Sequence, residues 1–240
     1  MKTNSKHLGL VTKKFNEFFF VDLKNKENFG NSERFLCKVR KSINFKDQFI
    51  YVGDEVEIDN IDLTSKRAVI ASLKKRQNLL NRPSVANISN IYITFSVEEP
   101  KLNLSQVNRF LISAESMGVE VSLVLTKCDL ISDKKQIFLL DKFKKWGYQA
   151  IILNLYKSDH FEDLLAQLKK KKCSIFMGPS GVGKTTLLNK IIPGLQNSTA
   201  PVSNKIKRGK NTTRNVELFS ISNQSYIVDT PGFNMQPLEV

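Results

Sequence analysis

The residues with the clearest chemistry are Gly178, Gly183, Lys184 and Thr185, which fill the pattern G-x-x-x-x-G-K-[ST] in the stretch GPSGVGKTT. Glycines at this spacing let backbone N–H groups turn toward phosphate oxygens, and the amino end of a following helix adds partial positive charge. Lys184 would reach the β- and γ-phosphates, and the Thr185 hydroxyl would bind Mg²⁺. The alternative is a glycine-rich turn. The candidate phosphate-binding residues are Gly178, Pro179, Ser180, Gly181, Val182, Gly183, Lys184, Thr185 and Thr186.

A second element is the stretch YIVDTPGF, residues 226–233, in which an apolar strand ends at Asp229. A carboxylate in that position would hold Mg²⁺ through water, and the backbone N–H of Gly232 would sense the γ-phosphate. Taken alone, the stretch could equally be a strand that ends in a Pro-Gly turn. Beside a phosphate loop, the metal-binding interpretation is favoured.

The stretch TKCDL, residues 126–130, resembles the guanine-reading motif N-K-x-D of GTPases, with Thr126 in place of Asn. Asp129 would accept hydrogen bonds from guanine N1–H and the 2-amino group, while the stem of Lys127 packs on the base. Adenine offers no such pair of donors, so the carboxylate would select GTP over ATP. The alternative is a helix cap after a strand.

Residues 205–214, KIKRGKNTTR, contain Thr212 and Thr213, which resemble the switch threonines that close over Mg²⁺ and the γ-phosphate in GTPases. The interval 200–216 holds five basic residues and no acidic residue, so it carries a charge of +5. One interpretation is a solvated basic loop. The other is a nucleotide-ordered switch that also touches RNA phosphates.

The elements that must position these residues follow two different patterns. From residue 8 to about 73, five short strand-like runs are separated by polar turns, which predicts a small β-barrel. An oligonucleotide-binding (OB) barrel is favoured over an SH3-like one. Residues 74–83 resemble a connection. From residue 90, strands and helices alternate, which predicts a mostly parallel sheet with helices on both faces. The expected domains are an RNA-binding barrel, residues 1–75, and an α/β domain, residues 76–240.

The composition of the 240-residue chain predicts a polyanionic partner, because its net charge is +14 and its pI is near 9.7. Residues 1–83 and 84–240 each carry +7, so the barrel is the denser in charge. No apolar run reaches the roughly 18 residues of a membrane span, and no signal peptide is recognised, so we expect a cytoplasmic protein without membrane contact. We also expect a monomer. Its three cysteines are far apart, which favours reduced thiols.

The order of the motifs is unusual, because Asp129 precedes Gly178 by 49 residues whereas an ordinary GTPase has its phosphate loop first. A basic barrel followed by LTKCDL, GPSGVGKTTLLNK, RGKNTTR and DTPGF resembles the RsgA (YjeQ) family of GTPases that depend on the small ribosomal subunit. The stretches FLCKVR, VGDEVEI and NLLNRPSVANI extend the likeness from about residue 8 to the end. The resemblance implies an OB barrel, a circularly permuted G domain of the P-loop class, and GTP hydrolysis stimulated by the small (30S) subunit in its late maturation, with 16S rRNA as a contact.

Three departures from the family pattern affect the expected chemistry. Asn211 stands where the family has His before its switch threonines, so a role for that His is not transferred. Phe233 replaces the water-orienting Gln of many GTPases, as it does in the family, which predicts slow intrinsic turnover. The family continues into a zinc-binding domain after DTPG, and we expect no zinc ligands in this chain, which ends at Val240.

Two functions follow, and a third remains possible. The first is a GTPase of ribosome assembly, with GTP or GDP and Mg²⁺ as ligands and catalysis by Lys184, Thr185, Thr212, Thr213 and Gly232. The second is an RNA-binding assembly module that uses GTP as a structural switch with little turnover. A P-loop ATPase of another class survives only if Asp129 does not read guanine.

Overall fold

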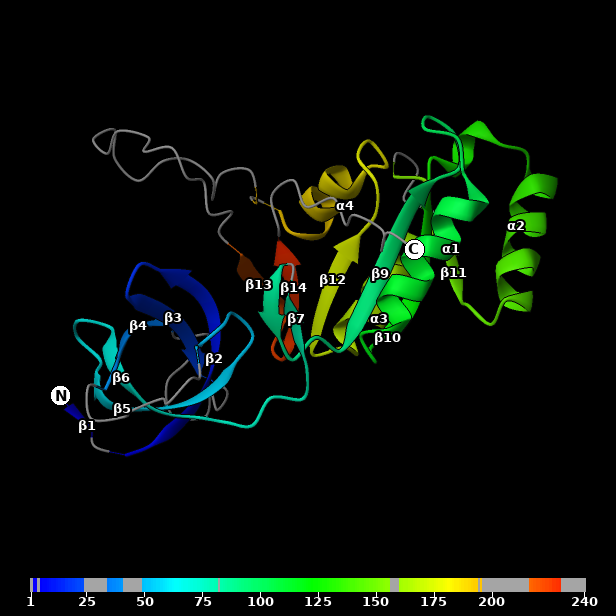
Figure 1. Ribbon diagram of the computed structural model, residues 1–240. Helices are drawn as coiled ribbons and strands as arrows, with labels where there is room; N and C mark the ends of the chain where they lie inside the picture. Colours follow the sequence, from blue (N-terminus) through cyan, green and yellow to red (C-terminus); the bar gives the residue numbers. More distant parts are fainter. Residues whose placement is uncertain are drawn as a thin grey trace, which may run out of the picture. The chain divides into compact units, whose positions relative to one another are not determined.

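The computed structural model describes residues 2–3, 5–23, 34–40, 49–81, 83–155, 160–193, 195 and 216–229 (Figure 1). The chain forms two compact units. The first contains Met1–Ile88 and Asn215–Pro231, and the second contains Ser89–Arg214 and Gly232–Val240. These units are defined by contacts between segments and not by a single boundary along the chain. The predicted domain boundary between residues 75 and 76 therefore stays a prediction.

The first unit contains a closed barrel. Its strands are β2 (His7–Phe15), β3 (Phe18–Leu23), β4 (Arg34–Val39), β5 (Glu55–Asp62) and β6 (Arg67–Leu73). They pair in the order β2-β3-β4-β6-β5, and β5 also pairs with β2, which closes the ring. The β4–β6 pair is parallel and the others are antiparallel. A short strand, β1 (Lys2–Thr3), pairs with β5. The predicted five-stranded barrel of the OB type is therefore confirmed.

The barrel core follows from the alternation of side chains along each strand. Val56 and Ile58 of β5 are fully buried, as are Phe35 and Cys37 of β4, because every second residue points inward. Larger strand residues such as Phe19 also contribute to this core, so part of the barrel's aromatic content fills its interior rather than facing a ligand.

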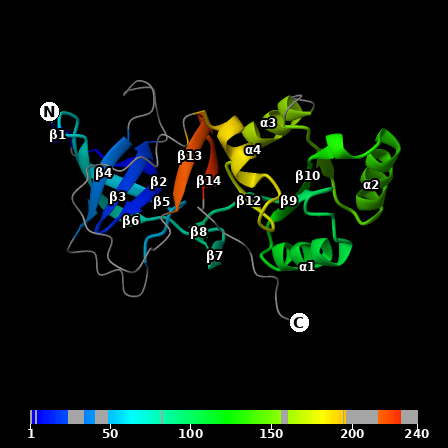
Figure 2. The ribbon, with the colours of Figure 1, turned by 90° about the horizontal axis from the view of Figure 1, so that it is seen from above.

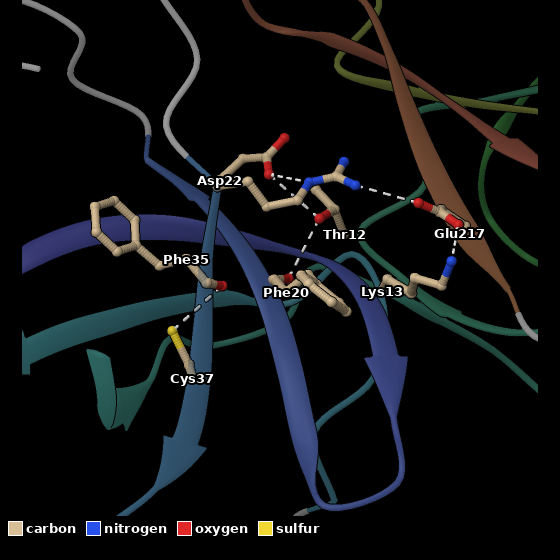
Figure 3. Close-up of polar contacts among 8 residues, drawn as sticks. Thr12, Lys13, Phe20, Asp22, Phe35, Cys37 and Glu217 are labelled. Atoms are coloured by element: carbon tan, nitrogen blue, oxygen red, sulfur yellow. Dashed lines mark hydrogen bonds and ion pairs between the residues drawn. The ribbon is translucent and has the colours of Figure 1, made fainter. Parts of the chain in front are cut away.

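A hairpin at the end of the described residues pairs with one strand of the barrel. It consists of β13 (Glu217–Ser222) and β14 (Ser225–Asp229), which are antiparallel. Glu217 of β13 pairs with Lys13 of β2 across the antiparallel ladder. Figure 3 shows the side chains that meet where β13 approaches the barrel. The sequence predicted both strands but not their pairing partner.

The predicted connection, residues 74–83, contributes one strand to a second small sheet, whose other strand follows directly after it. The strands β7 (Leu79–Asn81) and β8 (Ser84–Ala86) are antiparallel. Leu80 and Val85 face each other in this pair and are buried. The run is short and contains Pro83, so its sequence resembled a linker, whereas the burial of its few apolar side chains makes it a hairpin.

The second unit contains a parallel sheet. Its strands are β9 (Asn90–Ser96), β10 (Glu120–Thr126), β11 (Ala150–Ile152) and β12 (Cys173–Met177), in the order β12-β9-β10-β11. Every pair in this order is parallel. All residues of β9 and β12 are buried, as is typical of parallel strands that are covered on both faces. The carboxyl ends of these strands meet at one edge of the sheet, where ligands bind in such folds.

Helices cover both faces of this sheet, as predicted. They are α1 (Leu104–Glu115), α2 (Asp133–Lys145), α3 (Phe161–Lys169) and α4 (Lys184–Ile191), with the short 3₁₀ helix η1 (Cys128–Leu130) after β10. Figure 2 shows α1 on one side of the strands and α3 with α4 on the other. Phe110 of α1 packs edge-on against Phe95 of β9 with ring centres 5.4 Å apart, so α1 is fixed to the sheet by an aromatic contact.

The three cysteines are free and buried, which agrees with reduced thiols. Burial raises the pKa of Cys37 and of Cys173 to about 12 and that of Cys128 to about 11, so the thiolate form is disfavoured in all three. Within the described part of the chain, no helix combines the length and apolar character needed to cross a membrane.

Candidate functional site

The phosphate-loop motif forms the turn between β12 and α4. Gly178 is buried and has a φ of +150°, and a Cβ built on it would lie 2.0 Å from the carbonyl oxygen of Thr94 on β9. Only glycine fits so close to a neighbouring backbone. Gly183 has a φ of +89° and precedes α4 without any side-chain cap, so the first N–H groups of the helix remain available to an anion.

Lys184 lies across this loop. Its Nζ donates hydrogen bonds to the carbonyl oxygens of Gly178, at 2.8 Å, and of Pro179, at 2.5 Å. Burial lowers the pKa of Lys184, because the ammonium group has lost part of its hydration. A partly dehydrated cation beside uncapped helix N–H groups favours a polyanionic ligand such as a nucleotide phosphate chain.

The base-reading motif lies beside the phosphate loop. Thr126 ends β10, and its hydroxyl donates to the Val182 carbonyl of the phosphate loop at 2.6 Å. A second contact of that hydroxyl, to the carbonyl of Phe95 on β9, is 3.3 Å long. Because Thr126 is completely buried, these contacts are shielded from water. The structure therefore brings together two motifs that are separated by 49 residues in the sequence.

The next residues carry the candidate base-reading side chains. Lys127 has a φ of +56°, a conformation that residues other than glycine adopt rarely and often at functional sites. Its Nζ donates to the carbonyl of Glu99 in the loop after β9. Asp129 follows in η1 with its side chain exposed, as a carboxylate that recognises a ligand must be.

The segment after β11 also approaches the loop, and the sequence did not indicate it. A Cβ on Gly183 would lie 3.7 Å from Cδ1 of Leu155, and Lys190 of α4 donates to the Leu155 carbonyl at 2.8 Å. Leu153 donates its N–H to Leu125 at 2.7 Å, which aligns the segment with β10. The contacts use backbone groups and apolar side chains, so no motif of reactive residue types marks the segment.

The remaining candidates are placed as follows. Thr185 and Thr186 are exposed on the first turn of α4, as are Ser180 and Gly181 in the loop, whereas Val182 is buried. Asp229 is the last residue of β14, in the first compact unit. The other three candidates, Thr212, Thr213 and Gly232, lie outside the described residues, together with Asn211 and Phe233.

The donor chemistry of the candidates matches Mg²⁺. The Thr185 hydroxyl and the Asp229 carboxylate are hard oxygen donors, and Mg²⁺ prefers one or two such protein ligands together with phosphate oxygens and water. Among the described residues, no group of three or more His, Cys, Asp or Glu side chains is placed to hold a metal.

The fold and site together define a class of protein. The sheet carries the candidate guanine-reading loop after β10 and the phosphate loop after β12, on either side of β9, and a hydrogen bond joins the two loops. The candidate reading loop comes first along the chain. This combination is that of a circularly permuted P-loop GTPase. The OB-type barrel, which precedes the parallel sheet in the chain, is consistent with this class.

Comparison with known proteins identifies the family. A family model described as RsgA GTPase matches residues 73–239. The chain is 41% identical over 238 residues to the small ribosomal subunit biogenesis GTPase RsgA of Prochlorococcus marinus strain NATL1A, with 96% of the chain and 76% of that relative covered. It is 43% identical over 205 residues to the same-named protein of strain SARG, with 84% of the chain and 65% of the relative covered. The chain belongs to the RsgA GTPase family and is therefore a GTPase that binds guanine nucleotide.

Solved structures agree with this assignment. The crystal structure of YjeQ from Thermotoga maritima matches with a TM-score of 0.77 and 31% identity, covering 96% of this chain and 76% of that one. The structure of YloQ, described as a circularly permuted GTPase, matches with a TM-score of 0.75 and 25% identity, covering 96% and 73%. The predicted permutation is therefore confirmed.

Proposed function

We propose that this protein binds the small (30S) ribosomal subunit through 16S rRNA and hydrolyses GTP during late maturation of that subunit, as a cytoplasmic monomer. The names of its relatives support a role in small-subunit biogenesis. The net charge of +14 supports an RNA partner. In the barrel, Lys38 lies 4.7 Å from the ring centre of Phe18 and Phe15 is 53% exposed, so cations and an aromatic ring are both presented to solvent.

The observation that carries the nucleotide assignment is the hydrogen bond from Thr126 to the Val182 carbonyl. It holds the residue before Lys127 and Asp129 against the phosphate loop. One nucleotide could then contact the carboxylate of Asp129 with its base and the loop around Lys184 with its phosphates. A phosphate loop without this connection would support nucleotide binding but not a preference for guanine.

The roles of the site residues in hydrolysis follow from their donors. Lys184 and the N–H groups of the phosphate loop would stabilise negative charge on the β- and γ-phosphates. Thr185 and Asp229 would hold Mg²⁺, which supplies further charge neutralisation when bound. Thr212, Thr213 and Gly232 would close over the γ-phosphate. Because Phe233 has no group that could orient a water molecule, we expect slow turnover until the ribosomal subunit completes the site.

The test is GTP turnover with and without purified small subunits, at several salt concentrations. We expect slow release of phosphate from the protein alone and a marked acceleration by subunits. Because phosphate contacts depend on counterion release, the acceleration should fade steeply as salt increases. Release that is absent in both conditions would instead support an RNA-binding module that uses GTP as a structural switch. Competition between GTP and ATP for the site distinguishes the GTPase and the RNA-binding module, which prefer GTP, from an ATPase.

A further inference from the structure

Glu217 connects the barrel to the hairpin that follows the predicted switch threonines. Its Oε2 lies 2.5 Å from Nζ of Lys13 on β2, and its Oε1 lies 3.2 Å from Nη1 of Arg34 on β4 (Figure 3). The side chain of Glu217 is only 16% exposed. One partly shielded carboxylate is thus shared by two cations from two different strands, which restricts its position more than a single surface ion pair would.

The contacts continue into the barrel. Nε of Arg34 donates to Oδ1 of Asp22 at 2.9 Å, and these two residues are directly opposite each other on β3 and β4. Asp22 is buried and also accepts a hydrogen bond of 3.4 Å from the buried hydroxyl of Thr12. Burial alone would lower the pKa of Arg34, but the carboxylates of Asp22 and Glu217 raise it. Glu217 is therefore joined to the barrel interior and not only to its surface.

The position of Glu217 in the chain gives this network its significance. Thr213 precedes it by four residues, and the hairpin it begins ends at Asp229. The backbone ladder between β13 and β2 consists of one pair, Glu217 with Lys13. Among the described residues, the side-chain contacts of Glu217 therefore add to the single backbone pair that joins β13 to β2.

We propose that Glu217 is a positioning residue through which RNA contacts of the barrel affect GTP hydrolysis. In the sequence, the hairpin that it begins lies between the predicted switch threonines and Asp229. This inference rests on the proposed function. RNA phosphates that approach the barrel would attract its lysine and arginine side chains and shift their positions. Lys13 is open to this effect because its sequence neighbour Lys14 is exposed to solvent. A shift of Lys13 or Arg34 moves the Glu217 carboxylate and with it the start of β13, because both cations hold the same side chain.

The test is Glu217→Gln, which keeps the shape of the side chain and removes its charge. We expect basal turnover and the melting temperature to stay close to those of the wild type, while stimulation by purified small subunits falls about fivefold or more. The matched control is Glu57→Gln. Glu57 lies on the barrel, where its carboxylate is 2.6 Å from Nζ of Lys74 and 3.6 Å from Nζ of Lys6, with no contact to the hairpin among the contacts described. Stimulation should be unchanged in this control.

Three outcomes would overturn the inference. Stimulation of the Glu217→Gln variant could equal that of the wild type, or the control could lose as much stimulation. Basal and stimulated rates of the variant could also fall by the same factor, which would indicate a structural role only. A wild-type protein that subunits do not stimulate would overturn the proposed function as well, so the two failures are distinguishable.

A separate observation concerns the outer face of α2. Phe138 is 61% exposed there, and Lys134 and Lys142 lie one helical turn before and after it. Nζ of Lys142 is 5.8 Å from the ring centre of Phe138 and 5.7 Å from that of Trp146. The helix buries only Leu139 and Phe143, so most of its surface faces solvent.

The lysines of α2 are unevenly paired. Lys135 lies 2.9 Å from a carboxylate oxygen of Glu98, but no acidic partner is found in the described structure for Lys134, Lys144 or Lys145. Free cations around an exposed ring suit a ligand that combines phosphates with stackable bases. An acidic protein would use the cations but would not need the ring.

We further infer that the α2 face formed by Lys134, Phe138, Lys142 and Lys145 binds single-stranded RNA. The probe is a fluorescent uridine oligonucleotide of about ten nucleotides, within the usual range of such sites. Phe138→Ser and Lys134→Glu should each weaken binding about fivefold or more. Lys172→Glu makes the same charge change at an exposed lysine after α3 and should have a smaller effect. Equal losses in Lys134→Glu and Lys172→Glu, or wild-type binding by Phe138→Ser, would overturn the inference.

Discussion

At the scale of single residues, the side chain of Thr126 shows how a changed motif residue keeps its structural role. Asn is usual at this position in GTPases, but the threonine hydroxyl reaches the Val182 carbonyl at 2.6 Å. Thr126 is at the end of a buried strand, so a short side chain suffices to connect the two loops. The exposed residues that follow it, including Asp129, are then available to the base.

Thr126→Val tests this connection, because valine has nearly the same shape and no hydroxyl. The variant leaves a buried carbonyl without its partner, at a cost of about 1–3 kcal/mol. We expect the affinity for a fluorescent GTP analogue to fall about tenfold, corresponding to about 1.4 kcal/mol. Thr126→Ser keeps the hydroxyl and should bind nearly as well as the wild type. Equal affinities of the valine and serine variants would contradict the role of the hydroxyl.

Asp129→Asn tests guanine recognition. The amide presents a donor where guanine requires an acceptor, so binding of GTP should weaken and binding of xanthosine triphosphate should improve. The two affinities can be compared by competition against one fluorescent nucleotide. Glu115→Gln changes an acid on α1 in the same unit and should leave both affinities unchanged. Unaltered guanine preference in Asp129→Asn would remove the basis for its assignment.

At the scale of elements, the phosphate loop depends on its fit against a neighbouring strand. Gly178 follows β12 and packs on the backbone of β9 at Thr94, and Thr126 links the same loop to β10. Three adjacent strands of the sheet therefore determine the shape of one loop. The loop is buried at Gly178 and Val182, where it meets the sheet, and exposed at Ser180 and Gly181, where a ligand would approach.

Gly178→Ala should therefore be more harmful than an ordinary glycine substitution. Its methyl group would lie 2.0 Å from the Thr94 carbonyl, so β9 or β12 must move. We expect the free energy of unfolding to fall by more than about 3 kcal/mol and nucleotide binding to be lost. Gly147 also has a positive φ, +89°, but nothing lies within 4 Å of its added Cβ. Gly147→Ala should cost only about 1–2 kcal/mol in urea denaturation. Similar losses in the two variants would exclude the proposed clash.

At the scale of the whole molecule, buried titratable groups occur in both compact units. Cys37 belongs to the barrel core, while Cys173 and Tyr92 belong to the parallel sheet. Burial raises the pKa of each of the three to about 12. The ordinary values are 9.0 for the thiols and 10.0 for the phenol, so the folded chain retains protons that the unfolded chain releases at high pH.

The stability should therefore decrease in alkaline solution. The contribution of each thiol is fully present below pH 9 and is lost as the pH rises toward 12, at about 1.4 kcal/mol per pH unit. Urea denaturation between pH 8 and pH 10.5 measures this slope. Cys173→Ala removes one titrating group, so the stability should fall less steeply with pH. This holds even if the substitution also changes the stability at pH 8. An unchanged slope would show that Cys173 titrates normally in the folded protein.

The strands and helices could largely be predicted, because their period-two and helical patterns reflect burial that each element experiences locally. The glycines and Lys184 of the phosphate loop could be predicted as well, since a continuous loop needs those residue types at that spacing. The small hairpin of β7 and β8 could not be predicted, because its strands are as short as an ordinary connection and contain too few apolar residues to show a strand pattern. Leu155 could not either, because it acts through its backbone and an apolar side chain.

The sequence by itself determined the class of chemistry and the permuted order of the motifs, because both depend on residue types along continuous segments. Only the tertiary structure decided which distant side chains meet. Thr126 and Val182 are 56 residues apart, and Lys13 and Glu217 are 204 residues apart. Each contact depends on how strands align across a sheet, and strand register is set by packing over the whole unit rather than by the residues that pair.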